Sequence, residues 1–166
     1  MRMTDILAQP LTAEAFALFG DVLDVSGAPD RVINEGRCGR WHDRARVDCA
    51  GAVGISLFDA RPHALPHTFD LVERHPLGSQ AFLPMHGHPF LVIVAPDGAS
   101  GEGGRPGAPL AFVTAPGQGV NYHRGTWHGV LAPLHAPGLF AVVDYVGEEP
   151  NLEEHRFDAP FTVREA

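Results

Sequence analysis

The chain has no lysine and little cysteine, and each shortage excludes a kind of chemistry. All 12 residues counted as Lys or Arg are Arg. Without a lysine amine, the protein cannot form a lysine Schiff base or use a lysine nucleophile. The two cysteines, Cys38 and Cys49, form neither a C-x-x-C pair nor a zinc-binding spacing. We therefore expect both to be reduced thiols with no special role.

Long apolar runs and an excess of positive charge are also missing. The longest strongly apolar stretch, residues 90–95, is far shorter than the ~20 residues that cross a bilayer. The N-terminal residues lack the apolar core of a secretory signal. The formal net charge is −8, whereas nucleic acids and anionic membranes attract basic surfaces. We expect a cytoplasmic protein with neither of these partners.

Glycine and proline, in contrast, are abundant and predict a β-rich fold. The chain contains 19 Gly and 15 Pro, which disfavour long helices. Its 166 residues correspond to about one domain, so we expect a single domain over residues 1–166. Short strand-like segments separated by turn signals predict an all-β sandwich or barrel. The expected strands are 22–25, 53–58, 68–73, 80–83, 90–95, 110–114 and 139–146.

Three further segments have a clear pattern. Thr12 is a suitable N-cap for a short N-terminal helix, with Leu11 and Phe16 at the positions of a hydrophobic staple and Gly20 just beyond its end. We expect this helix to pack outside the sheets. The Gly-rich residues 97–109 predict a long exposed hairpin loop. The tail from residue 148 alternates acidic and apolar residues and is expected to pack along the outside.

A first group of polar residues surrounds the turn after residues 68–73. Strand alternation places Glu73 and His75 on one face and Arg74 on the other. Gln80 follows a Pro-Leu-Gly-Ser turn, near the start of the next strand. A solvent-exposed pair on an edge strand would explain Glu73 and His75 equally well, so the pattern alone does not establish a site.

The second group is the segment 121–128, Asn-Tyr-His-Arg-Gly-Thr-Trp-His. Gly125 permits a sharp turn that returns His128 to the following strand. His123 and His128 could instead only bond to the backbone, and we expect Tyr122 and Trp127 to be core or pocket-wall aromatics. His86-Gly87-His88 also resembles a metal-binding pair, but two histidines around a glycine before a proline are more often a turn.

Together, the two groups resemble the paired motifs of metal-binding cupins. In those motifs two His, a Glu and a Gly are followed, further along the chain, by a Pro-x-Gly turn and a third His. Here Glu73, His75, Gln80 and Gly87 have the first spacing, and residues 123–128 have the second. The resemblance implies a single-domain cupin jelly roll, and the Glu and Gln substitutions imply a weakened or absent metal site.

Two longer phrases resemble the signatures of the ureidoglycolate lyase family. They are residues 73–85, ERHPLGSQAFLPM, and residues 117–128, GQGVNYHRGTWH. Supporting stretches include residues 19–22, 40–43 and Asp144, and the likeness runs from residue 10 to about residue 150. His86 and His88 lie outside the family pattern.

The resemblance implies cleavage of (S)-ureidoglycolate to glyoxylate and urea in allantoin and purine catabolism, by a homodimer. Such chemistry needs groups that exchange protons near neutral pH and hydrogen bonds to the ureido and carboxylate groups. The Arg that binds the substrate carboxylate could be Arg124, Arg40 or Arg44, because Arg74 is expected to point outward. The predicted catalytic residues are Glu73, His75, His123 and His128. The predicted substrate-binding residues are Gln80, Asn121, Tyr122, Arg124 and Arg40.

The sequence does not determine whether a metal binds or which products the reaction releases. Family members are known with a divalent metal such as Ni²⁺ and without one. If a metal binds, we expect His75 and His128 to contact it, with Glu73 or Gln80 completing the set. An amidohydrolase acting on the same substrate would release ammonia and carbon dioxide, and a non-catalytic cupin would bind a small carboxylate or sugar acid. A metal-dependent dioxygenase is a more distant alternative, since Gln80 is a poor metal ligand.

Overall fold

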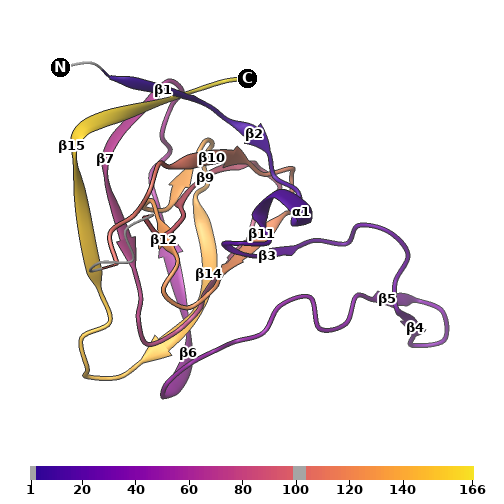
Figure 1. The fold of residues 1–166 in the computed structure, drawn as a ribbon. Helices are drawn as coiled ribbons and strands as arrows, with labels where there is room; N and C mark the ends of the chain where they lie inside the picture. The colour runs from indigo at the N-terminus through magenta and orange to yellow at the C-terminus, as the bar shows by residue number, and fades with distance from the viewer. Residues whose placement is uncertain (1–2, 99–103) are drawn as a thin grey trace.

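Two β-sheets form most of the molecule, as the sequence predicts. The structure, a computed structural model, describes residues 3–98 and 104–166. One sheet has eight strands, with the order β1-β15-β7-β12-β9-β10-β2 and β13 beside β9; the other has five, in the order β3-β11-β8-β14-β6. Together they enclose a nearly closed barrel (Figure 1). The expected all-β class and cupin-like jelly roll are therefore confirmed.

The element bounds follow the sequence pattern closely at the centre of the fold. Two predicted strands, residues 90–95 and 139–146, have the expected bounds, and the other five differ by one or two residues at either end. In chain order the elements are β1 (Thr4–Leu7), β2 (Gln9–Pro10), α1 (Ala13–Phe16), β3 (Gly20–Leu23), β4 (Arg31–Ile33), β5 (Cys38–Arg40), β6 (Ala52–Asp59), β7 (His67–Arg74), β8 (Gln80–Pro84), β9 (Phe90–Ala95), β10 (Leu110–Val113), β11 (Gly119–Tyr122), β12 (Trp127–His128), β13 (Ala132–Pro133), β14 (Leu139–Val146) and β15 (Glu153–Arg164).

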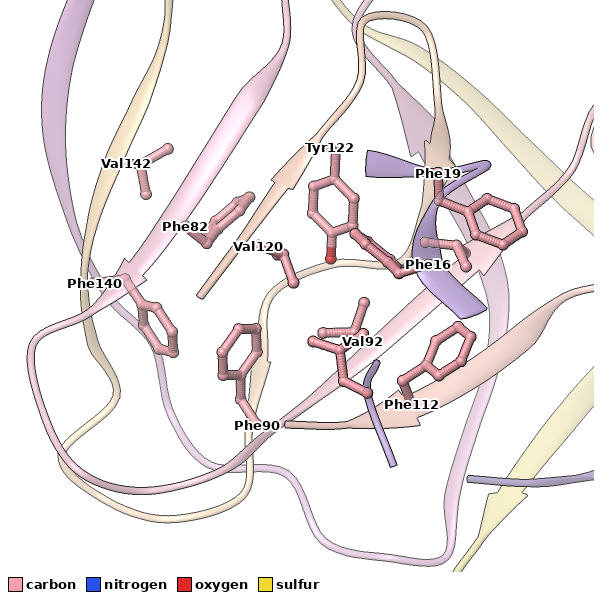
Figure 2. Close-up of a cluster of buried hydrophobic side chains, with 12 residues drawn as sticks. Phe16, Phe19, Phe82, Phe90, Val92, Phe112, Val120, Tyr122, Phe140 and Val142 are labelled. Carbon is pink, nitrogen blue, oxygen red and sulfur yellow. The ribbon is translucent and has the colours of Figure 1, made fainter. Parts of the chain in front are cut away.

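The main core lies between the two sheets and is rich in phenylalanine. β9 and β10 contribute side chains from one sheet, and β8, β11 and β14 contribute them from the other (Figure 2). Each fully buried Phe stabilises the fold by roughly 1.5–3 kcal/mol relative to an exposed one. The labelled members of this core are Phe16, Phe19, Phe82, Phe90, Val92, Phe112, Val120, Tyr122, Phe140 and Val142.

The N-terminal helix is shorter and more deeply packed than expected. The hydroxyl of Thr12 accepts from the Ala15 amide, so the predicted N-cap is present, but α1 spans only four residues. Phe16 is fully buried, and its ring packs edge-on against Phe112. After Phe16 the chain continues in tighter turns, in which the amides of Ala17 and Phe19 donate to the carbonyls of Glu14 and Phe16. Gly20 then begins β3, where a Cβ atom would lie 2.0 Å from the carbonyl oxygen of Asn121. The expectation that the helix packs outside the sheets is therefore incomplete, since its Phe16 side chain enters the core.

The predictions for the tail and for the Gly-rich loop have different outcomes. The tail forms β15, a long strand that pairs antiparallel with β7 and parallel with β1. Its alternating pattern therefore belongs to a sheet strand. β9 and β10 pair antiparallel and Asp97 bridges Pro106, which confirms the hairpin. The part of the predicted loop over residues 99–103 lies outside the described residues.

Between β3 and β6 the chain leaves the barrel as an extended arm. The short β4–β5 hairpin lies at the far end of this arm, well away from both sheets (Figure 1). Arg44 pairs with Asp30, and the Trp41 indole donates to the Ser26 carbonyl, so the arm is held mainly by its own contacts. The sequence pattern predicts neither strand of this hairpin.

Candidate active site

Glu73, His75 and His128 come from neighbouring chain segments at one end of the barrel. β7 and β12 pair so that His128 lies directly opposite Glu73. His75 follows one residue after the end of β7 and returns to the face of Glu73 by strand alternation. Gly125, with a φ of 77°, forms the turn that leads into β12. Arg74 points to the other face, where its guanidinium lies 4.5 Å over the Trp127 ring.

These three side chains form a compact polar cluster. Their potential ligand atoms all lie within 4.8 Å of one another. His75 Nε2 is 3.9 Å from a Glu73 carboxylate oxygen, and the rings of His75 and His128 are 5.2 Å apart between centroids. Tyr122 forms the wall beneath His128, with its ring stacked at 4.3 Å. Glu73, His75 and His128, whose sequence pattern alone does not establish a site, thus lie together in the structure.

Backbone carbonyls fix the tautomer of both histidines. Nδ1 of His75 lies 2.7 Å from the Asn151 carbonyl oxygen, and Nδ1 of His128 lies 2.9 Å from that of Gly129. A carbonyl oxygen only accepts, so Nδ1 carries the proton in each neutral ring. Each Nε2 is therefore a bare lone pair, and both Nε2 atoms are buried without a hydrogen-bond partner among the described residues. Two such atoms beside a carboxylate favour a cation or a donor-rich ligand between them.

Gln80 adds a fourth acceptor on the facing sheet. It begins β8 opposite Tyr122 of β11, and its side chain is buried between the sheets. Its Nε2 donates to the Asp144 carboxylate at 2.9 Å. Its Oε1 is buried with no partner in the described part of the chain. Gln80 Oε1 is therefore a buried acceptor on the strand beside Tyr122, whose ring stacks on His128 of the cluster.

Burial controls the protonation of this site. Desolvation raises the pKa of Glu73 above its usual value, against the opposing effect of nearby His75. Burial lowers the pKa of His128 to about 3, so that ring stays neutral at neutral pH. Burial, with Glu73 nearby, also raises the pKa of Tyr122. A carboxyl whose pKa is raised in this way is better suited to take up and release a proton near neutral pH.

The other residues predicted from the second phrase lie outside this cluster. Asn121 is buried, and its amide donates to Asp21 of β3 and to the Arg46 carbonyl. His123 lies 3.2 Å from the Asp21 carboxylate. β-strand alternation explains the split, since Tyr122 points between the sheets and its neighbours do not. The predicted catalytic role of His123 and the binding role of Asn121 stay predictions, and the structure brings neither residue to the cluster.

The predicted carboxylate-binding arginines are also engaged elsewhere. Arg124 donates to the Pro76 carbonyl at 2.6 Å and lies 3.7 Å from the Asp48 carboxylate. Arg40 lies on β5 in the arm, where its guanidinium contacts the His42 ring at 2.9 Å. Neither contact reaches Glu73, His75 or His128, so the role of both arginines stays a prediction.

His86 and His88 lie at the opposite end of the barrel, between β8 and β9. The His88 amide donates to His86 Nδ1, so His86 carries its proton on Nε2 when neutral. That nitrogen has no lone pair to offer a metal. The two residues lie in the bend that connects β8 to β9, in agreement with their place outside the family pattern.

Comparison with known proteins identifies the family. The ureidoglycolate lyase family model matches residues 3–164. The chain belongs to the ureidoglycolate lyase family. A ureidoglycolate lyase of Rhodobacter capsulatus is 59% identical over 163 residues, which cover 97% of this chain and 99% of the relative. Similar relatives are a ureidoglycolate lyase of Chelativorans sp., 51% identical over 97% of both chains, and ureidoglycolate lyase 2 of Rhizobium meliloti, 48% identical over 99% of this chain and all of the relative.

The sequence patterns do not predict some of the contacts that orient the site residues of this ureidoglycolate lyase family member. The acceptors for His75 and His128 are backbone carbonyls of Asn151 and Gly129, and any residue type carries such a carbonyl. The sequence indicates Asp144 only through the family likeness, although its carboxylate accepts a hydrogen bond from Gln80. Strand alternation could have predicted that the Asp144 side chain points inward, because Phe140 and Val142 of β14 lie on the same face and are buried in the core.

Proposed function

We propose that this chain cleaves (S)-ureidoglycolate to glyoxylate and urea. The observation that carries the proposal is the convergence of acceptor atoms of Glu73, His75 and His128, of which both imidazole Nε2 atoms are buried without a partner among the described residues. Gln80 is buried on the facing sheet, opposite the Tyr122 whose ring stacks on His128. The substrate can supply donors to these acceptors, because it has one hydroxyl and three ureido N–H groups. The names of the relatives and the family membership support the same reaction.

Glu73 is the residue that we propose moves the proton. The hydroxyl proton leaves as the carbon–oxygen bond becomes the carbonyl of glyoxylate, and the carbon–nitrogen bond breaks with its electron pair on nitrogen. That nitrogen then takes a proton and departs as urea. The raised pKa of Glu73 suits a carboxylate that accepts the first proton and returns it to nitrogen. No water is consumed, so the reaction is a lyase reaction.

The same residues fit a divalent metal such as Ni²⁺. The Nε2 atoms of His75 and His128 are buried without a partner among the described residues, and a carboxylate adjoins them. Neutral imidazole and carboxylate suit such ions, and Glu73, His75 and His128 would hold one. A bound cation would supply positive charge that favours loss of the hydroxyl proton. Glu73 would hold the ion together with the two histidines, and Gln80 would be left for the substrate.

Elemental analysis tests the metal proposal without relying on turnover. We expect about one equivalent of a divalent metal in the purified parent, removed by exhaustive chelation and rebound on addition of Ni²⁺. A His128→Phe variant should fail to rebind the ion. If the chelated parent contains no metal and keeps full activity, the metal is dispensable.

The decisive experiment for the function measures products. Purified protein is incubated with racemic ureidoglycolate, and glyoxylate, urea and ammonia are quantified. We expect glyoxylate and urea in equal amounts, with half of the racemate consumed. Ammonia in place of urea would show an amidohydrolase. No products at all, with a binding isotherm for the substrate, would show a non-catalytic cupin.

We also propose that the enzyme is a cytoplasmic homodimer. The outer face of the edge strand β6 carries Val53, Ile55 and Leu57, of which Ile55 is 75% exposed. Apolar rows on an edge strand usually need cover, and a second copy would supply it. The arm that extends away from both sheets (Figure 1) would offer a second copy further surface to contact. In the described part of the chain, no helix is both long and apolar enough to cross a membrane.

Light scattering tests the homodimer. We expect the parent to have the mass of two chains at micromolar concentration, and an Ile55→Arg variant to have a mass nearer one. A parent mass of one chain across that range would contradict the homodimer. The exposed and distant His88 offers a matched control, since His88→Arg should keep the parental mass.

A further inference from the structure

The hydrogen bond between Gln80 and Asp144 determines which end of the Gln80 amide faces the site. An amide side chain can rotate so that either its oxygen or its nitrogen faces a given direction. An ionised carboxylate accepts and cannot donate. Asp144 therefore selects the orientation in which Gln80 Nε2 points to β14, at 2.9 Å from the carboxylate oxygen. The amide oxygen of Gln80 is then left unpaired and buried.

The position of that oxygen connects it to the proposed site. Gln80 and Tyr122 are directly paired in the β8–β11 ladder, and both side chains are buried between the sheets. Tyr122 in turn stacks on His128 at 4.3 Å. Gln80 is therefore one strand away from the wall of the Glu73, His75 and His128 cluster. A buried acceptor without a donor is unfavourable, so a ligand that supplies a donor there is favoured.

We propose that Asp144 is a positioning residue that makes Gln80 an obligatory acceptor for the terminal ureido NH₂ of the substrate. This inference rests on the proposed function and deepens it, because it assigns the residue pair that selects an unsubstituted urea end. A substrate without the terminal N–H groups would leave Gln80 Oε1 buried and unpaired. Sites built around such a hydrogen bond discriminate strongly against analogues that lack the donor.

The test compares ureidoglycolate with an analogue whose terminal nitrogen carries two methyl groups. The readout is the ratio of the two kcat/KM values in the parent, Asp144→Asn, Gln80→Glu and the Gln80→Glu/Asp144→Asn double variant. Asp70→Asn serves as a matched control, because Asp70 pairs only with Arg156 at the surface among the described residues. Circular dichroism and thermal unfolding confirm that each variant is folded.

Asparagine at position 144 can donate as well as accept, so Gln80 is free to turn. For Asp144→Asn we expect the KM for ureidoglycolate to rise about tenfold, with kcat within a few-fold of the parent. The preference over the dimethyl analogue should fall about tenfold. Gln80→Glu should lose more, because two carboxylates then face each other. The double variant should recover part of that loss, since the new amide can donate to Glu at position 80 and leave its other oxygen to the site.

Two results would separate the possible failures. If the folded Asp144→Asn keeps the parental preference, or the double variant is no better than Gln80→Glu alone, the inference about Asp144 is wrong while the proposed function stands. If the parent produces no glyoxylate and urea, the proposed function fails and this inference fails with it. An Asp70→Asn variant with the same loss of preference as Asp144→Asn would also overturn the inference.

Discussion

The segment 121–128 divides between two regions with opposite character. Tyr122 and His128 lie between the sheets, where the neighbouring acceptors are buried and unpaired. Asn121 and His123 lie on the other side, where both contact Asp21 of β3. The inner region thus leaves the Nε2 atoms of both histidines and Gln80 Oε1 unpaired, whereas the outer region leaves Asn121 Oδ1 unpaired and uses the Asn121 amide and the His123 ring to join β11 to β3. Unpaired buried polar atoms are costly, so the inner region is where a ligand is expected.

The comparison also separates two kinds of histidine. His128 is 1% exposed, and its pKa is lowered to about 3 by burial. The His123 side chain is 46% exposed and faces a carboxylate. Both belong to the same signature phrase, so membership of a motif does not distinguish a ligand-facing residue from a strand-pairing one. We therefore expect substitutions in the inner region to lower activity, and substitutions in the outer region to lower stability with little effect on activity.

The largest expected effect is on turnover when Glu73 becomes Gln. Glutamine keeps the shape but cannot exchange a proton, and loss of such a group typically costs about 10²–10⁴-fold in rate. The measurement is steady-state kcat on ureidoglycolate. With both proteins chelated, the same variant should have a higher melting temperature than the parent at pH 7, because the raised pKa of Glu73 means that folding disfavours its ionised form. Parental turnover in a folded Glu73→Gln protein would remove Glu73 from the mechanism.

A second prediction compares the two regions directly with one type of substitution. His75→Asn should lower kcat at least about 10²-fold, since it removes an imidazole lone pair from the inner site. His123→Asn should leave kcat within a few-fold. The distant His88→Asn is the control and should match the parent. If His123→Asn loses as much turnover as His75→Asn in folded protein, the outer region belongs to the active site.

A third prediction concerns stability against pH. His128 is neutral in the folded protein down to about pH 3, whereas in the unfolded chain it takes up a proton near its ordinary pKa of 6.5. Stability from this group is present above pH 6.5 and is lost as the pH falls, by up to about 1.4 kcal/mol per pH unit. Glu73, with its pKa raised, acts in the opposite sense and offsets part of the loss.

Guanidinium unfolding of the chelated protein between pH 7 and pH 4.5 measures this slope. His128→Phe keeps an aromatic ring against Tyr122 but does not titrate, so its stability should depend less on pH than that of the parent. Equal slopes in the two proteins would contradict the buried, neutral state of His128.

The smallest expected effect belongs to the outer region. Asn121→Ala removes the donors to Asp21 and the Arg46 carbonyl, and should lower the free energy of unfolding by about 1 kcal/mol. Turnover at a temperature where the variant is folded should stay within a few-fold of the parent. Denaturant unfolding and steady-state assays provide the two values. Unchanged stability with lost turnover would reverse the roles of the two regions.

The sequence alone determined the β-class, seven strands near the centre of the fold and the shared face of Glu73 and His75. These features depend on local patterns, namely the two-residue alternation of strands and the Gly and Pro residues that end them. The same patterns identified Gly125 as the turn that returns His128 to a strand. They placed the N-cap of α1 at Thr12 correctly but put the end of the helix too late, because the chain tightens into turns at Ala17 and Phe19 before Gly20 packs closely against β11.

Only the tertiary structure decided which polar residues meet. His128 faces Glu73 because β12 pairs with β7 across more than fifty residues of chain, and no local pattern encodes that register. The backbone carbonyls that fix the two histidine tautomers, and the carboxylate of Asp144 that orients Gln80, come from segments distant in sequence. Likewise, β15 becomes a sheet strand because β1 and β7 flank it. The sequence determines the chemistry of each side chain, but which side chains meet depends on the pairing of strands distant in sequence, and therefore on the packing of the whole fold.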